Sequence, residues 1–403
     1  MSFAPRVERV RPSLTLQINA EAAAMERGHE NVARLGAGEP DFDTPEHIRQ
    51  AAHQAIEAGY TRYTAVDGYP DLRAAVREKF ARDNDLQFAD EEVMVTCGAK
   101  QALSDLAQVL LRSGDEAVIP RPYWVSYPAQ VTLAEADPVF VDAPMDEDFT
   151  IAPERLDAAL GERTRLLYLN SPNNPTGRVY RRAELEAIAE VLRRHPRVWV
   201  VSDDIYEHIR FDSGPFLNLL SVAPDLADRT LVVNGVSKAY AMTGWRVGFV
   251  GGPRQVISEM TKVQGQSTAG TASISQHAAQ AALRGDQSVV DHMVAAFRTR
   301  HERIVPALDA LPGIRCRPSD GTFYAFPDAS GLIERLPDVD DDRELAERLL
   351  HDAEVAVVPG SGFGMPGHLR VSFAASMDTI DTALERLSEF IERETSDAGT
   401  QTR

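Results

Sequence analysis

The sequence predicts an α/β fold built on a mainly parallel sheet that lies between helices. From Val93 onward, short apolar runs alternate with helix-like or turn-rich segments, and this alternation is typical of a parallel sheet covered on both faces. The runs are bounded by turn residues, as expected for buried strands. The expected strands cover residues 93–96, 117–119, 138–141, 166–169, 198–201, 231–233 and 247–250.

A second, smaller α/β unit is predicted toward the carboxyl end, where the pattern first turns largely helical. The helices expected there cover residues 272–284, 287–308, 342–351 and 377–394. The strands expected there lie near residues 314–316, 323–326, 355–358 and 369–373. We expect the first 45 residues to pack with this unit. The predicted division is therefore 1–45, 46–295 and 296–403.

Composition and charge exclude several classes of function. The chain has 403 residues, 43% of them hydrophobic and 26% charged, which fits a globular protein of more than one domain. Its net charge of −19 argues against nucleic acid or an anionic membrane as a partner. Without an apolar leader or membrane-length run, we expect a cytoplasmic protein. Cys97 and Cys316 are too few for a disulfide framework or a metal cluster, and no metal is expected.

The amino-terminal region contains a predicted loop and a predicted helix start. Residues 35–42 form a glycine-rich loop, whose glycines let the backbone approach a ligand closely. Thr44 is the expected N-cap of a helix that has Pro45 at its first position and continues to about Glu57.

A lysine lies between two of the predicted strands, in the stretch from Val236 to Gly248. Lys238 follows the first strand, and a lysine held in a partly desolvated site can attack a carbonyl to form a Schiff base. Ser237 and Arg246 would suit the phosphate of a cofactor joined to that lysine. The alternative, an ordinary surface lysine before a buried strand, is equally compatible with this stretch alone.

Polar residues follow two other predicted strands. Residues 170–177 have the composition of a turn, which is the simpler interpretation of that segment alone. Residues 202–208 bring carboxylates and a phenol to a strand end, where ligands bind in α/β proteins. Because both segments and Lys238 converge on one edge of the sheet, a ligand site is favoured.

Taken in order, these motifs resemble those of class I aminotransferases of the aspartate aminotransferase family, which are pyridoxal-phosphate enzymes of fold type I. The resemblance covers nearly the whole chain. Its motifs lie at residues 12–13, 38–42, 122–124, 173–177, 203–206, 237–238 and 369–372. It implies a large domain that binds pyridoxal 5′-phosphate, a smaller domain formed by both termini, and a homodimer with active sites at the subunit interface.

The resemblance also implies roles around the cofactor ring. Lys238 would carry the cofactor as a Schiff base and, as the free amine, move the proton at the substrate Cα. Asp203 would keep the pyridine nitrogen protonated. Tyr206 and Asn174 would hydrogen-bond the ring's phenolic oxygen, and Trp124 would stack on the ring face.

Further residues are implied for the phosphate, which would lie at the N-terminus of a helix beginning near Ala99. The phosphate-binding residues would be Gly98, Ala99, Lys100, Ser237, Arg246 and, from the other subunit, Tyr63. Arg370 would grip the substrate α-carboxylate, with Gly38 closing over it. The subgroup that the sequence most resembles has a lysine at the position of Lys100 for a distal carboxylate, and Arg11, Ser13 and Thr15 could add polar contacts.

The expected function is the transfer of the amino group of L-aspartate to 2-oxoglutarate by a ping-pong mechanism, with amino acids and 2-oxo acids as substrates. One alternative is an aminotransferase with aromatic or prephenate substrates. Others are a pyridoxal-phosphate lyase or synthase on the same fold and a regulator that binds the cofactor. The regulator is disfavoured because no basic DNA-binding module precedes residue 12.

Overall fold

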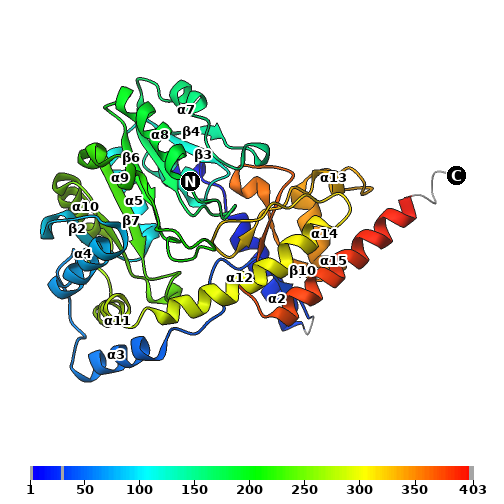
Figure 1. The fold of residues 1–403 in the computed structure, drawn as a ribbon, viewed down its shortest axis with the longest axis horizontal. Coiled ribbons are helices and arrows are strands. Elements are labelled where there is room, and N and C mark those ends of the chain that lie inside the picture. Colours follow the sequence, from blue (N-terminus) through cyan, green and yellow to red (C-terminus); the bar gives the residue numbers. More distant parts are fainter. Residues whose placement is uncertain (1–2, 29–30, 399–403) are drawn as a thin grey trace.

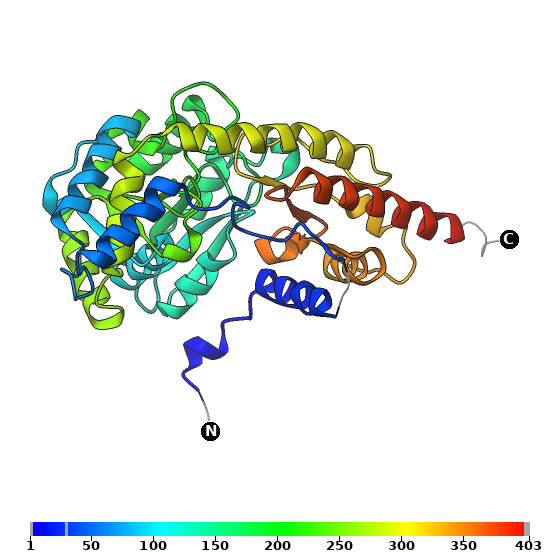
Figure 2. The ribbon, with the colours of Figure 1, turned by 90° about the horizontal axis from the view of Figure 1, so that it is seen from below.

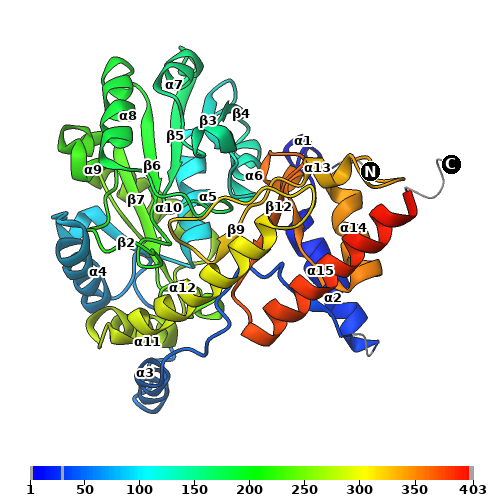
Figure 3. The ribbon, with the colours of Figure 1, turned by 45° about the vertical axis from the view of Figure 1, so that its right-hand side comes forward.

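The protein consists of a larger and a smaller unit lying side by side (Figure 1). The computed structural model describes residues 3–28 and 31–398. Figure 3 shows the strands of the larger unit between its helices, and Figure 1 shows helix α12 (Ser288–Asp309) running from the larger unit to the smaller one.

The larger unit is built on a seven-stranded sheet with the strand order β2-β8-β7-β6-β5-β3-β4. Its strands are β2 (Val93–Thr96), β3 (Glu116–Arg121), β4 (Asp137–Asp142), β5 (Thr164–Asn170), β6 (Trp199–Asp203), β7 (Thr230–Gly235) and β8 (Gly248–Gly251). Strand β8 runs antiparallel to β2 and β7, and every other pairing is parallel. The mainly parallel, mixed sheet predicted from the apolar runs is therefore confirmed.

Helices cover both faces of this sheet, which explains why strands β2, β7 and β8 are buried along their whole length. The helices are α3 (Glu46–Glu57), α4 (Pro70–Asn84), α5 (Ala99–Leu110), α6 (Ser126–Leu133), α7 (Pro153–Ala159), α8 (Arg182–Arg194), α9 (Leu219–Val222), α10 (Arg254–Ser267) and α11 (Ser273–Arg284). Short 3-10 helices occur at η1 (Asp90–Glu92), η2 (Met145–Glu147), η3 (Pro224–Arg229), η4 (Thr243–Trp245) and η5 (Gly360–Phe363).

The predicted cap of helix α3 is wrong. Pro45 occupies the cap position, and the helix begins at Glu46. The hydroxyl of Thr44 instead donates a hydrogen bond of 2.6 Å to the carbonyl of Ala241. This contact ties the amino-terminal segment to the loop that follows Lys238.

The smaller unit contains short strands in two sheets. Its strands are β1 (Ala33–Arg34), β9 (Tyr324–Ala325), β10 (Val355–Ala356), β11 (Val358–Pro359) and β12 (Leu369–Ser372). Strands β11, β12 and β9 form an antiparallel sheet, and β1 pairs with β10 in parallel. Its helices are α2 (Leu14–Arg27), α13 (Ser330–Ile333), α14 (Asp342–Ala353) and α15 (Met377–Ala398). The short helix α1 (Pro5–Glu8) lies instead against α6 of the larger unit, so the expectation that all of the first 45 residues pack with the smaller unit does not hold for this helix. Figure 2 shows α12 and α15 running side by side, with α2 on the opposite side of this unit.

Two strand predictions for this unit need correction. The run at residues 355–358 is two strands, because its first half pairs with β1 and its second half with β12. Residues 314–316 form no strand, since Arg315 makes only an isolated bridge to Asp328. Short runs of apolar residues do not say which partner strand they will meet.

The amino-terminal segment joins the smaller unit through backbone pairing of β1 with β10. Helix α12 spans the boundary expected at residue 295, and the division into 1–45, 46–295 and 296–403 remains a prediction. Within residues 3–28 and 31–398, no helix has both the length and the apolar character needed to span a bilayer.

Candidate active site

A cavity of about 460 Å³ opens at the carboxyl edge of the large sheet and is lined by residues of both units. Strands β2, β5, β6 and β7 all end at this edge, and the antiparallel strand β8 begins there. The predicted site residues that line the cavity are Thr15, Gly38, Ala99, Lys100, Trp124, Asn174, Asp203, Tyr206, Ser237, Lys238, Arg246 and Arg370. The strand-end motifs thus converge as the sequence predicted.

Lys238 lies three residues beyond the end of β7 and reaches into the cavity. Its amine donates a hydrogen bond of 2.6 Å to the carbonyl of Gly38. Burial, followed by the positive charge of Arg370, lowers the pKa of Lys238 to about 8. The amine is therefore deprotonated more readily than an ordinary lysine, which favours its use as a nucleophile or base.

Asp203 ends strand β6 and is buried against the cavity. Burial raises the pKa of Asp203 to about 6, while a hydrogen bond of 2.6 Å from the phenol of Tyr127 opposes that rise. The amide of Ile205 donates to the other carboxylate oxygen at 3.3 Å. Asp204, in contrast, accepts hydrogen bonds from Ser202 and Asn218 and does not line the cavity. The side chains of these two neighbouring acids therefore have different surroundings: that of Asp203 lines the cavity, and that of Asp204 does not.

The turn before helix α5 brings backbone close to a guanidinium. Gly98 has a φ of 81°, and a Cβ added there would lie 2.3 Å from Nη2 of Arg246. A Cβ on Gly248 would lie 2.3 Å from the amide nitrogen of Ala99. Glycine at both positions therefore lets the helix N-terminus and Arg246 sit together, which forms a cradle for an anion.

Lys100 stands at the side of this cradle, with its ammonium 5.0 Å from the centroid of the Trp124 ring. Loss of water contact around its ammonium, and then the charge of Arg246, lower the pKa of Lys100. The residue as a whole is nevertheless exposed in the single chain. It is therefore placed to meet an anion that enters beside Trp124.

Arg370, on strand β12, is only 2% exposed. Its guanidinium donates to the side-chain oxygen of Asn174 at 3.2 Å and to the carbonyl of Gly36 at 2.9 Å. It lies 4.5 Å from the centroid of the Tyr324 ring, and the Tyr324 hydroxyl is 2.9 Å from that of Tyr206. The Nε of Arg370 has no hydrogen-bond partner.

Positive charge in the cavity exceeds negative charge, since four cations and two acids, Glu39 and Asp203, line it. Within the described part of the chain, Lys100, Lys238, Arg246 and Arg370 form no ion pair with a carboxylate. Arg370 is buried and Lys238 is partly buried, so water compensates their charge less than at a surface. This surplus, with the cradle at Gly98, fits a ligand that carries a phosphate and a carboxylate.

Four predicted residues lie outside the cavity lining. Ser13 is the cap residue of α2, Arg11 is exposed, and Gly98 belongs to the cradle, where it lies against the guanidinium of Arg246. Tyr63 is 98% exposed, so it cannot serve the cavity of its own chain. Thr15 does line the cavity, and its buried hydroxyl has no partner.

Two residues of this site, Tyr127 and Tyr324, were not predicted. Tyr127 follows the predicted site residue Trp124 by three positions, and their ring centroids are 5.4 Å apart, so its nearness in sequence was the available signal. Tyr324 had no comparable signal, because its contact with Tyr206 joins residues 118 positions apart.

A second cavity, of about 450 Å³, contains a cluster of charges that is structural. Asp83, Glu207 and His208 lie close enough to hold a metal ion. However, the ammonium of Lys79 already forms an ion pair with Glu207, and Asn84 donates a hydrogen bond to it at 2.6 Å. Burial would raise the pKa of Glu207, but Lys79 and His208 hold it well below its usual value.

A buried aspartate and a lysine of lowered pKa line one cavity at the carboxyl edge of a mainly parallel sheet, an arrangement typical of the active site of an α/β enzyme. The family model described as aminotransferase class I and II matches residues 30–387. The chain belongs to this family, and the family prediction is confirmed.

Relatives and solved structures agree along nearly the whole chain. The aspartate/prephenate aminotransferase of Nitrosomonas europaea is 46% identical over 396 residues, which cover 97% of this chain and 100% of the relative. The aspartate aminotransferase of Rhizobium meliloti is 45% identical over 97% of this chain and 96% of its own length.

Among solved structures, the aspartate aminotransferase from Rhizobium meliloti has a TM-score of 0.94 and 44% identity, covering 98% of this chain and 99% of that one. The aspartate aminotransferase from Thermus thermophilus with maleate has a TM-score of 0.90 and 41% identity, covering 96% and 99%. The protein is an aminotransferase.

Proposed function

We propose that this aminotransferase moves the amino group of L-aspartate to 2-oxoglutarate, with pyridoxal 5′-phosphate as cofactor. The observation that carries the proposal is the surplus of positive charge in one cavity. Lys100, Arg246 and Arg370 offer separate sites for the two carboxylates of the substrate and for the phosphate of the cofactor. Relatives named aspartate aminotransferase support the choice of substrate.

The chain's own residues fit this cofactor. When bound, pyridoxal phosphate supplies an electron sink for the negative charge that develops at the substrate Cα. The cradle of Gly98, Ala99, Ser237 and Arg246 would bind its phosphate. Asp203, held by Tyr127 as a hydrogen-bond acceptor, would bind the protonated ring nitrogen.

Proton transfer falls to Lys238. An amine with a pKa of about 8 is close to the working pH, which is where a general base is most effective. Lys238 would hold the cofactor at rest and, once released, take the proton from Cα and return it on the cofactor side. Tyr206 and Asn174 would orient the ring's phenolic oxygen, and Trp124 would exclude water from one ring face.

Substrate recognition divides between two cations. Arg370, with Asn174 beside it and Gly38 opposite, would grip the α-carboxylate that every amino acid carries. Lys100 would bind the distal carboxylate of aspartate or glutamate. Thr15, whose hydroxyl lacks a partner, could add a hydrogen bond there.

A homodimer would complete the site. Tyr63 is 98% exposed and Tyr60 is 42% exposed. Tyrosine is enriched at protein interfaces, so these exposed rings favour contact with a second subunit. In a second copy, Tyr63 would reach the phosphate cradle.

Sedimentation should report a dimer. Tyr63→Phe should weaken cofactor binding while the dimer persists; a monomeric, fully active enzyme would contradict the proposal.

Separate half-reactions test the proposed function. Aspartate alone should change the absorbance of the bound cofactor and release oxaloacetate in an amount equal to the enzyme. After removal of aspartate, 2-oxoglutarate should restore the absorbance and yield glutamate. Product that forms only when both substrates are present would rule out ping-pong transfer. A stronger response to phenylalanine than to aspartate would favour the alternative with aromatic substrates, and a stronger response to prephenate as acceptor would agree with the name of the Nitrosomonas relative.

The role of Lys100 can be separated from that of Arg370 by substrate comparison. Lys100→Ala should lower kcat/KM for aspartate. The corresponding loss of transition-state stabilisation should be about 1.5–3 kcal/mol, the range for a hydrogen bond to a charged group. The lysine is exposed in the single chain, so the effect of a fully buried pair is not expected. Phenylalanine should be affected little, because it lacks the distal carboxylate.

Arg370→Ala is the matched control, since it should damage aspartate and phenylalanine alike. The measurement is the ratio of kcat/KM for the two amino acids in the wild type and both variants. If Lys100→Ala left this ratio unchanged, the distal carboxylate would have to be bound elsewhere, with Thr15 the next candidate.

A further inference from the structure

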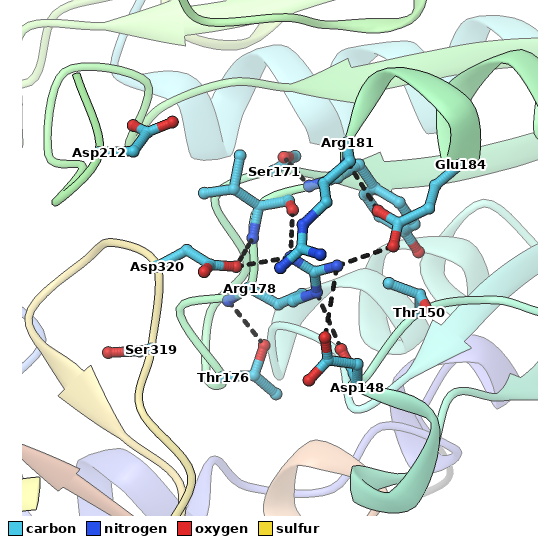
Figure 4. Close-up of polar contacts among 12 residues, drawn as sticks. Asp148, Thr150, Ser171, Thr176, Arg178, Arg181, Glu184, Asp212, Ser319 and Asp320 are labelled. Atoms are coloured by element: carbon cyan, nitrogen blue, oxygen red, sulfur yellow. Dashed lines mark hydrogen bonds and ion pairs between the residues drawn. The ribbon is translucent and has the colours of Figure 1, made fainter. Parts of the chain in front are cut away.

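The two units meet at a loop contact close to the Arg370–Asn174 pair. Asn174 belongs to a turn of the larger unit that ends at Arg178, and Asp320 lies in the smaller unit before strand β9. Figure 4 shows Arg178 between Asp320 on one side and Glu184 and Asp148 on the other. The contact therefore joins the loop that carries Asn174 to the unit that carries Arg370.

Arg178 is held from several directions although it is only 6% exposed. Its guanidinium donates to the carboxylate of Asp320 at 2.6 Å and to that of Glu184 at 2.7 Å (Figure 4). Its Nε donates to the carbonyl of Asp148 at 3.0 Å. A buried arginine with acceptors from both units leaves little freedom for either to shift.

Backbone contacts extend the junction. The amide of Asp320 donates to the carbonyl of Gly177 at 3.1 Å, and the amide of Val179 donates to the Asp320 carboxylate at 3.1 Å. A Cβ on Gly177 would lie 2.3 Å from the carbonyl oxygen of Gly321. The two loops are therefore in direct backbone contact, which only glycine at position 177 allows.

The Asn174 turn is also held by hydrogen bonds within it and to its neighbours in sequence. The amide of Asn174 donates to the side chain of Asn170 at 2.9 Å, and the amide of Asn173 donates to the carbonyl of Arg178 at 2.9 Å. Arg178 thus closes the turn from its far end. Movement of Arg178 would displace Asn174 relative to Arg370.

We propose that Arg178 is a positioning residue for substrate binding: through Asp320 it holds the Asn174 loop in register with Arg370, so that both side chains meet the substrate's α-carboxylate together. This role rests on the proposed function, in which Arg370 and Asn174 bind that group. It adds a residue that touches neither substrate nor cofactor. Because the α-carboxylate is common to all amino acids, Arg178 governs affinity for every substrate and not the choice among them.

The test compares Arg178→Gln, Arg178→Lys and Asp320→Asn with the wild-type holoenzyme. Arg178→Gln should raise KM for aspartate and phenylalanine by a similar factor, about tenfold, because a displaced contact residue weakens binding even when it is intact. The kcat should fall by less than about threefold, because Tyr206 would still orient the cofactor's phenolic oxygen when Asn174 is displaced. Arg178→Lys keeps the charge but loses the forked pair of donors, so its KM should lie between those of the wild type and Arg178→Gln.

A second test asks whether substitutions of Arg178 and Asp320 affect KM independently of each other. If Arg178 acts through Asp320, the double variant Arg178→Gln/Asp320→Asn should be at most about twofold worse in KM than the worse single variant. Fully multiplicative effects would overturn the proposal. Should Arg178→Gln fail to fold, Asp320→Asn and Arg178→Lys carry the same comparison.

A control distinguishes positioning from general destabilisation. Arg348 and Glu394 form an ion pair of 2.7 Å inside the smaller unit, away from the junction. Arg348→Gln should lower thermal stability without changing KM. If Arg178→Gln behaved in the same way, with KM within about twofold of wild type, the positioning role would be wrong.

Hydrogen exchange in the cofactor-free protein separates this inference from the proposed function. Amides of residues 173–179 should exchange about tenfold faster in Arg178→Gln than in the wild type, since local opening no longer breaks the junction. Unchanged exchange would overturn the proposal. If Arg370→Ala left all substrates unaffected while exchange still rose, the loop would be held as described but the assigned carboxylate site would be wrong.

Discussion

Positive charge without a paired carboxylate is the constraint on which the active-site cavity depends. Arg370 is buried with its Nε unsatisfied, and Lys238 shares the cavity with it. Repulsion between these cations adds to burial in lowering the pKa of the lysine. The same charge attracts anions to a chain whose overall charge of −19 would otherwise repel them. In the proposed function, the reactivity of Lys238 and the binding of the substrate therefore share one electrostatic cause.

The fold produces this arrangement from distant parts of the chain. Parallel strands bring Asp203 and Lys238 to one edge of the sheet, and the antiparallel strand β8 delivers Arg246 to the same edge. The smaller unit supplies Arg370 from strand β12. The hydrogen bond of Arg178 with Asp320 joins the two units close to this site.

The parts of the site that depend on local sequence could be predicted, and the parts that depend on contacts between distant segments could not. Strand-end motifs could be predicted because apolar runs fix where strands end, and the site uses those ends. The split of residues 355–358 and the partner of Tyr324 could not, because both depend on pairing between segments far apart in the chain. The expected N-cap at Thr44 failed for a related reason, since a tertiary hydrogen bond to Ala241 competes with the local cap.

The pH profile of Lys238 acetylation in the cofactor-free protein tests the electrostatic account most directly. With acetic anhydride in brief pulses and the exposed Lys262 as internal reference, reactivity of Lys238 should rise with pH to half its plateau near pH 8. Arg370→Met should move that midpoint upward, because it removes a repelling charge, and pyridoxal phosphate should protect Lys238. A midpoint near the ordinary lysine value of about 10.4, unmoved by the Arg370 variant, would contradict the account.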